Sequence, residues 1–113
     1  MVSGVNASFA ALFTFGNMLA NTAGNVANVN TNGYKKTVAT ITEDAQGLPE
    51  LSLTKSDSAG PLIQENGIMT EASNVDLAEE LPQMIVAQRG YEANIKALKV
   101  QDDLLKSTID ILA

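Results

Sequence analysis

The first thirty-four residues of this chain carry no charged side chain, because every Asp, Glu, Lys and Arg lies at or beyond Lys35. A surface helix normally keeps a charged side for water. The stretch therefore predicts a long helix, from Ser3 or Asn6 to about Asn28, that is enclosed by other protein. Apolar and small residues recur in it at alternating intervals of four and three, the period of a helix packed along another helix: Val5, Phe9, Leu12, Gly16, Leu19, Ala23 and Val26.

The C-terminal region has the strongest helical pattern in the chain. We expect this second helix to begin at Ser73 or Asn74, with Pro82 either kinking it or marking the start of regular helix. Its apolar seam again alternates intervals of four and three, and nine of its eleven positions are apolar, which identifies a helix-packing side. The seam comprises Leu77, Leu81, Met84, Gln88, Tyr91, Ile95, Leu98, Asp102, Leu105, Ile109 and Leu112.

The region between the helices alternates apolar with hydroxylated side chains, as half-buried strands do. Thr37–Thr42 and Leu51–Thr54 are the expected strands, joined by a hairpin loop at 43–50. Residues 61–63 are expected to start a third short strand. Because so small a sheet has little independent stability, we expect it to lean on the helices or on another subunit.

These patterns predict a mainly α fold in which two long helices pair as an elongated coiled-coil hairpin, with a small β-hairpin-like insert between them. The expected parts are an N-terminal helix and turn motif at 1–34, a β-rich insert at 35–73 and a C-terminal coiled-coil helix at 74–113. So thin a hairpin leaves much apolar surface bare. Assembly with other copies is the expected way of covering it.

Composition narrows the possible functions. The net charge of −6 argues against nucleic acid and anionic membranes, since both are bound mainly through Lys and Arg clusters. His and Cys are absent, so the usual proton shuttles, thiol nucleophiles and thiolate metal ligands are missing. No catalytic, cofactor or metal site and no small-molecule substrate is expected. The N-terminus lacks the basic flank of a signal peptide, and polar residues interrupt its apolar runs, so membrane insertion is not expected either.

Two local features have alternative interpretations. Gly90 lies inside the second helix, where glycine costs about 1 kcal/mol relative to Ala. With Tyr91 beside it on the seam, it indicates a close helix crossing, either within the fold or in an axial polymer. Four asparagines also lie along one side of the first helix. They indicate either a side that faces solvent or amides that form hydrogen bonds with neighbouring subunits. They are Asn17, Asn21, Asn25 and Asn28.

Two motifs resemble the bacterial flagellar basal-body rod and hook protein family. Residues 23–35, AGNVANVNTNGYK, are similar to the N-terminal signature of these axial proteins, ANNIANVNTPGYK. Residues 73–80, SNVDLAEE, and 87–94, AQRGYEAN, resemble the C-terminal block of the family. The motifs cover both predicted helices. The resemblance implies that these helices pair and stack in the inner tube of the axial structure, which transmits torque.

The resemblance also implies where the chain works and what it contacts. It implies a place in the flagellar basal body, in the periplasmic rod or hook region, and export through the flagellar type III apparatus without a cleaved signal peptide. The implied partners are other copies of the chain and neighbouring rod and hook proteins. The subunit contacts are expected at nine motif residues: Asn25, Asn28, Asn30, Gly33, Tyr34, Gln88, Gly90, Tyr91 and Asn94.

The chain departs from the family pattern at three points. Gly24 and Asn32 replace an Asn and a Pro of the signature, and Pro82 stands where the family has a helix-compatible residue. The middle region is also far shorter than the β domains of hook and distal-rod proteins, which favours a proximal-rod-like or minor paralogous component. The alternative function is a helical-hairpin adaptor or chaperone-like module of flagellar assembly, which binds one partner without polymerising.

Overall fold

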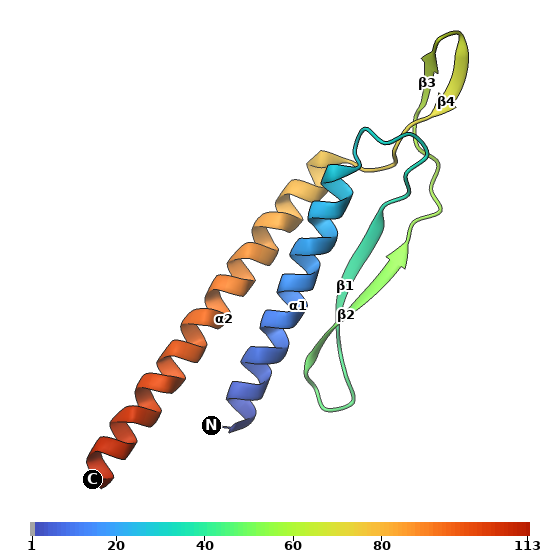
Figure 1. The fold of residues 1–113 in the computed structure, drawn as a ribbon. Helices are drawn as coiled ribbons and strands as arrows, with labels where there is room; N and C mark the ends of the chain where they lie inside the picture. The colour runs from blue at the N-terminus through green and yellow to red at the C-terminus, as the bar shows by residue number, and fades with distance from the viewer. Residues whose placement is uncertain (1) are drawn as a thin grey trace.

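The computed structural model describes residues 2–113, and this part of the chain forms two helices and four strands. The molecule is elongated, with extents of 78 × 25 × 15 Å. Figure 1 shows α2, α1 and the β1–β2 hairpin lying side by side, with β3–β4 projecting at one end. The elements are α1 (Val2–Ala27), β1 (Thr37–Glu43), β2 (Pro49–Lys55), β3 (Leu62–Glu65), β4 (Ile68–Glu71) and α2 (Leu77–Leu112).

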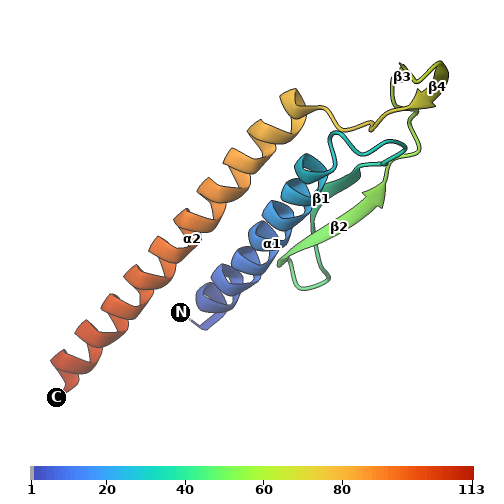
Figure 2. The ribbon, with the colours of Figure 1, turned by 45° about the horizontal axis from the view of Figure 1, so that its top comes forward.

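Helix α1 is the central layer, with α2 on one side and the β1–β2 hairpin on the other (Figure 2). The two helices run antiparallel, so the described ends of the chain lie far from β3–β4 (Figure 1). Thr14 Oγ1 donates a hydrogen bond to the carbonyl of Pro49 at 3.0 Å, which fastens β2 to α1. The buried positions of α1 are spaced by three and four residues, so they lie on one side of the helix, and they are mostly small or polar: Ser8, Ala11, Thr14, Met18, Thr22 and Asn25.

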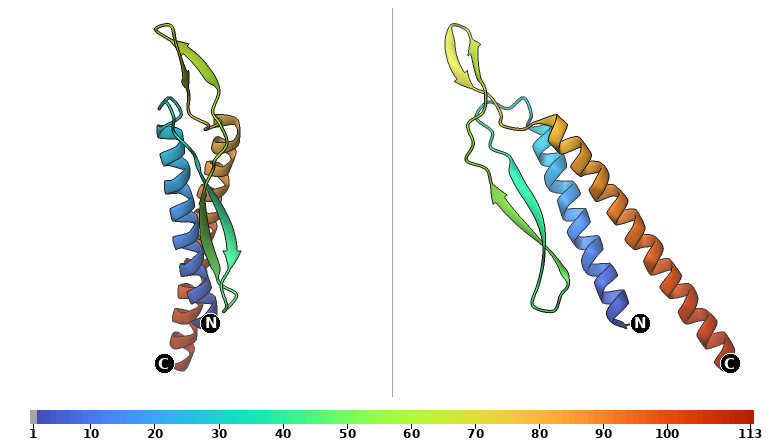
Figure 3. Two further views of the ribbon diagram at one scale, coloured as in Figure 1. Left: turned by 90° about the vertical axis from the view of Figure 1, so that its right-hand side faces the viewer. Right: turned by 180° about the vertical axis from the view of Figure 1, so that it is seen from behind.

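Helix α2 begins at Leu77, later than expected. Asp76 is its N-cap, and the Asp76 carboxylate accepts a hydrogen bond from the backbone N–H of Ala78. Pro82 lies inside the helix, which continues through it to Leu112 (Figure 3). A proline near the start of a long helix removes only one of many backbone hydrogen bonds, so regular helix can begin before Pro82.

The expected fold class, a mainly α coiled-coil hairpin with one small β-hairpin-like insert, is wrong. The insert forms two separate antiparallel sheets, β1–β2 and β3–β4. The apolar seam of α2 packs against α1 only in part: Tyr91 lies beside Gly16, but most of the large seam side chains are exposed. Seven seam residues are exposed: Leu77, Leu81, Tyr91, Ile95, Leu105, Ile109 and Leu112.

The helices meet mainly along a line of small and polar residues on α2. Ala87 is completely buried there, and Gly90 lies against the ring of Phe15. A β-carbon at Gly90 would lie 2.6 Å from Phe15 Cε1, so the close crossing depends on the missing side chain. The core is correspondingly small: Met18, Ala39 and Ala87 are buried together, with Phe15, Leu19 and Leu51 packed around them.

The β1–β2 hairpin confirms the two expected strands. Pairing runs from Thr37 opposite Lys55 to Glu43 opposite Pro49. In the loop, the Asp44 carboxylate accepts hydrogen bonds from two backbone N–H groups, each at 2.8 Å. The hairpin also leans on α1, as the small size of the sheet led us to expect.

The β3–β4 hairpin contains the expected third strand and a fourth that we did not expect. Asn66 (φ 53°) and Gly67 (φ 82°) form its two-residue turn, in the left-handed conformation that a tight hairpin requires. An Asn-Gly pair between short apolar runs is itself a hairpin signal. The strands project beyond the helices (Figure 3), and their large apolar residues are exposed: Leu62, Ile63, Ile68 and Met69.

The base of β3–β4 is fastened to the turn that follows α1. Lys35 Nζ forms an ion pair with Glu71 and donates a hydrogen bond to the carbonyl of Ser58 at 2.9 Å. The Gly60 N–H also donates to the Glu71 carboxylate, at 2.8 Å. The Lys35 ammonium first, and the Gly60 N–H second, hold the pKa of the Glu71 carboxyl below its ordinary value.

We expect Gly90→Ala to lower the free energy of unfolding by about 1 to 3 kcal/mol, because the added methyl group overlaps the Phe15 ring. Urea denaturation measures the change. The matched control is Gly24→Ala in α1, where no atom lies within 4 Å of the new β-carbon. Alanine is the better helix former, so the control should gain up to about 1 kcal/mol. Equal gains in both variants would contradict the close crossing.

We expect the Lys35–Glu71 pair to contribute to the acid sensitivity of the fold. The pKa of Glu71 is lower in the folded chain, so the ionised carboxylate stabilises the fold above the unfolded-state pKa. That contribution is lost as the pH falls through the folded-state pKa. Glu71→Gln and Lys35→Met should each flatten the decline of unfolding free energy in this acid range, measured by urea denaturation at a series of pH values. A decline as steep as in the unmodified chain would contradict the assignment.

Candidate functional site

Asn25, one of the predicted interface residues, lies inside the chain and is 1% exposed. Its Nδ2 donates to the Thr37 carbonyl at 2.9 Å and to Glu80 Oε2 at 3.2 Å. Its Oδ1 accepts from the Thr37 N–H at 3.1 Å and from the Tyr34 hydroxyl at 3.2 Å. An asparagine amide has two donor hydrogens and two acceptor lone pairs, so the hydrogen-bonding capacity of Asn25 is fully used.

These bonds bring the two sequence motifs together. Asn25 binds both backbone groups of Thr37, as a residue of an adjacent strand does, and so attaches β1 to α1. Its third and fourth partners come from the turn before β1 and from the first turn of α2. Glu80 is 4% exposed and was not among the predicted site residues. The SNVDLAEE motif contains it, but the sequence alone does not show which of its two adjacent glutamates is buried.

The asparagine side of α1 is used mainly within the chain. Asn21 Nδ2 donates to the Thr37 carbonyl at 2.8 Å, beside the bond from Asn25. Asn28 Nδ2 bonds to the carbonyl of Gly24, four residues earlier in the helix, also at 2.8 Å. Asn17 is exposed. This side of α1 is therefore neither simply solvated nor free for a neighbouring subunit.

The remaining predicted residues lie on α2 and in the turn between α1 and β1. Asn94 Nδ2 bonds to the Gly90 carbonyl at 2.8 Å, within α2. Gly33 has a φ of 74°, which suits glycine in this turn. The interface role of the nine residues stays a prediction. Four of them are exposed and free to meet a neighbour: Asn30, Gly33, Gln88 and Tyr91.

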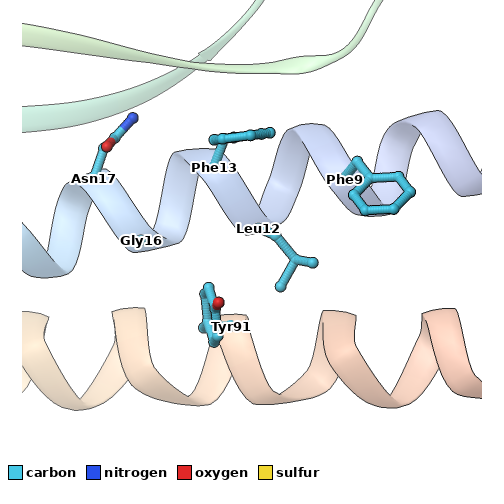
Figure 4. Close-up of a pocket in the computed structure, with 6 residues that line it drawn as sticks. All are labelled: Phe9, Leu12, Phe13, Gly16, Asn17 and Tyr91. Atoms are coloured by element: carbon cyan, nitrogen blue, oxygen red, sulfur yellow. The ribbon is translucent and has the colours of Figure 1, made fainter.

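A groove of about 300 Å³ lies between α1 and α2 (Figure 4). Phe13, beside it, is 72% exposed. Tyr91 Cε2 lies 3.6 Å from the place of a β-carbon on Gly16, so the missing side chain leaves room for the tyrosine ring. Among the residues that the structure describes, no charged one lines this groove, whose walls are Phe9, Leu12, Phe13, Gly16 and Asn17 of α1 and Tyr91 of α2. Such a surface suits another apolar helix.

Two ion pairs join charged side chains along the surface of α2. Arg89 and Glu92 lie 3.2 Å apart, and Lys106 and Asp102 lie 2.9 Å apart. The Asp102 carboxylate raises the pKa of the Lys106 ammonium. Within residues 2–113, no three His, Cys, Asp or Glu side chains are placed to hold a metal ion together, and neither helix is long and apolar enough to span a membrane.

We expect Asn25→Asp to lower the free energy of unfolding by about 3 kcal/mol. The substitution replaces the donor Nδ2 with a carboxylate oxygen, which would face two other acceptors, Glu80 Oε2 and the Thr37 carbonyl, in a buried position. Urea denaturation measures the loss. The matched control is Asn17→Asp, which makes the same chemical change at an exposed position of the same helix. It should change stability by less than about 0.5 kcal/mol. Similar losses in the two variants would contradict the role of the Asn25 bonds.

Comparisons with known proteins find similarity to flagellar rod and hook proteins. The family model of the flagellar basal body rod FlgEFG protein C-terminal region matches residues 67–111, which include β4 and most of α2. The chain is 43% identical over 67 residues to the flagellar hook protein FlgE of Salmonella typhimurium, covering 59% of this chain and 16% of that protein.

Two rod proteins are similar over more of the chain than this hook protein is. The flagellar basal-body rod protein FlgG of Buchnera aphidicola is 38% identical over 81 residues, which are 72% of this chain and 28% of that protein. FlgG of Borreliella burgdorferi is 43% identical over 77 residues, 68% of this chain and 26% of that protein. The chain thus spans less than a third of the length of these relatives. It belongs to the family of flagellar basal-body rod and hook proteins.

Proposed function

We propose that this chain is a structural subunit of the bacterial flagellar rod or hook region, and that it self-assembles through α1 and α2 into the axial tube that transmits torque. One observation carries the proposal. Helix α1 has no charged side chain, and α2 exposes the large apolar residues of its seam. Exposed apolar surface of this kind marks protein interfaces, and the proposal is supported by relatives that are named as hook and rod proteins.

The partners follow from the same argument. The chain assembles with other copies of itself and with neighbouring rod and hook proteins, in the periplasmic part of the basal body. It reaches that place unfolded through the flagellar type III export apparatus. No catalytic step is part of the proposal, since its relatives are named as hook and rod proteins.

The nine predicted interface residues divide into two roles. Those at the surface, such as Gln88 and Tyr91, contact the neighbouring subunit directly. Those inside, above all Asn25, keep α1, α2 and β1 in the arrangement that presents the interface. A subunit of this kind keeps its shape through internal hydrogen bonds and joins its neighbours through exposed apolar side chains.

The function is tested by quantitative immunoblotting of hook–basal bodies purified from the native host, alongside the soluble fraction. Enrichment at several copies per structure is the expected result. Presence of the chain in the soluble fraction alone would overturn the proposal and favour the adaptor that binds one partner without polymerising.

We expect Leu81→Glu and Ile95→Glu to remove the chain from purified basal bodies while leaving the unfolding free energy of the isolated chain nearly unchanged. Both side chains are exposed in the single chain, so the new charge has no cost until a neighbour covers it. The control is Lys55→Glu at the end of β2, which changes charge away from the seam. Normal incorporation of the seam variants would show that the seam is not an interface.

A further inference from the structure

Within one chain, α1 covers a limited length of α2. The covered part runs from Glu80, bonded to Asn25, to Gln101, whose Nε2 lies 3.4 Å from the place of a β-carbon on Gly4. Between these two residues, Ala87 of α2 is completely buried against α1. The contact is narrow because Glu80, Ala87 and Gln101 have small or polar side chains.

The same side of α2 continues beyond Gln101 with different residues. Positions four, eight and eleven residues further along lie on one side of a helix, and here they are Leu105, Ile109 and Leu112, all exposed. We call Asp102–Leu112 the α2 tail. Its three large apolar residues extend an interface that is already formed within the chain, so the side chains are placed to receive a second helix of the α1 type.

The groove between α1 and Tyr91 has the matching chemistry. Its lining is uncharged and mainly apolar, with Gly16 of α1 facing the Tyr91 ring (Figure 4). The tail is about 16 Å long and the α1 wall from Phe9 to Gly16 about 10 Å, at 1.5 Å per helical residue. The side chains of Leu105, Ile109 and Leu112 can therefore extend along the groove, and none of the three carries a charge into it.

We propose that the α2 tail of one copy docks into the Phe9–Tyr91 groove of a second copy. This inference rests on the proposed function and names the contact through which copies join. The tail cannot reach the groove of its own chain: Gly4 and Gln101 lie level, so Phe13 and Ile109 are about 25 Å apart along the helices. Because the two surfaces differ, the contact is heterologous and leaves a free tail and a free groove at the ends of every assembly.

The absence of cysteine makes disulfide trapping a clean test. We expect the double variant Phe13→Cys, Ile109→Cys to form a ladder of dimers, trimers and higher species on mild oxidation, since each copy carries both halves of the contact. A mixture of the two single variants should give heterodimers only. Dimers of Ile109→Cys alone would show tails pairing with each other and overturn the proposal, as would the absence of interchain products from the double variant.

The matched control moves the second cysteine to the opposite side of the tail, in Phe13→Cys, Ser107→Cys, and should give no ladder. Adding Leu105→Glu to the double variant should abolish the ladder, because a charge would enter an uncharged groove. The proposed function is tested separately by the basal-body immunoblot. A chain enriched in basal bodies that forms no ladder overturns the tail contact alone. A ladder from a chain absent from basal bodies overturns the flagellar role alone.

Discussion

Four hydrogen bonds from the Asn25 side chain join parts of the molecule that are far apart in sequence: β1, the turn that precedes it, and the first turn of α2. An unpaired polar group in such a buried position costs about 1 to 3 kcal/mol, so the amide is stable there only if all these partners are in place together. The small apolar core does not specify this arrangement alone. The position of the β1–β2 hairpin on α1 therefore depends on this polar contact.

On the side of α1 away from the hairpin, α2 packs chiefly through small residues. Ala87 is buried in this contact, and Gly90 lies against Phe15. Many large apolar residues of the α2 seam remain exposed, so the single chain leaves apolar surface uncovered. The proposed assembly is a way of covering that surface.

Periodicity predicted several elements well. The bounds of α1 and the two strands of the first hairpin follow from spacing and turn residues that act locally. The fold class was wrong because a seam with a period of 3.5 residues shows that a helix packs, but not against which partner. The fourth strand was missed although Asn66-Gly67 signals a hairpin. Glu80 was missed because burial of one glutamate and exposure of its neighbour depend on the direction from which α1 approaches.

The sequence by itself determined that two long helices form, that the first carries no charge, and that both have apolar sides in need of a partner. These properties belong to short stretches of chain and are visible in residue spacing. Only the tertiary structure decided which side each helix uses within the chain. That choice follows from contacts between distant residues, chiefly the bonds of Asn25 to Thr37 and Glu80 and the approach of Phe15 to Gly90. Their effect is a helix contact made largely by small residues, which leaves much of the expected internal seam exposed.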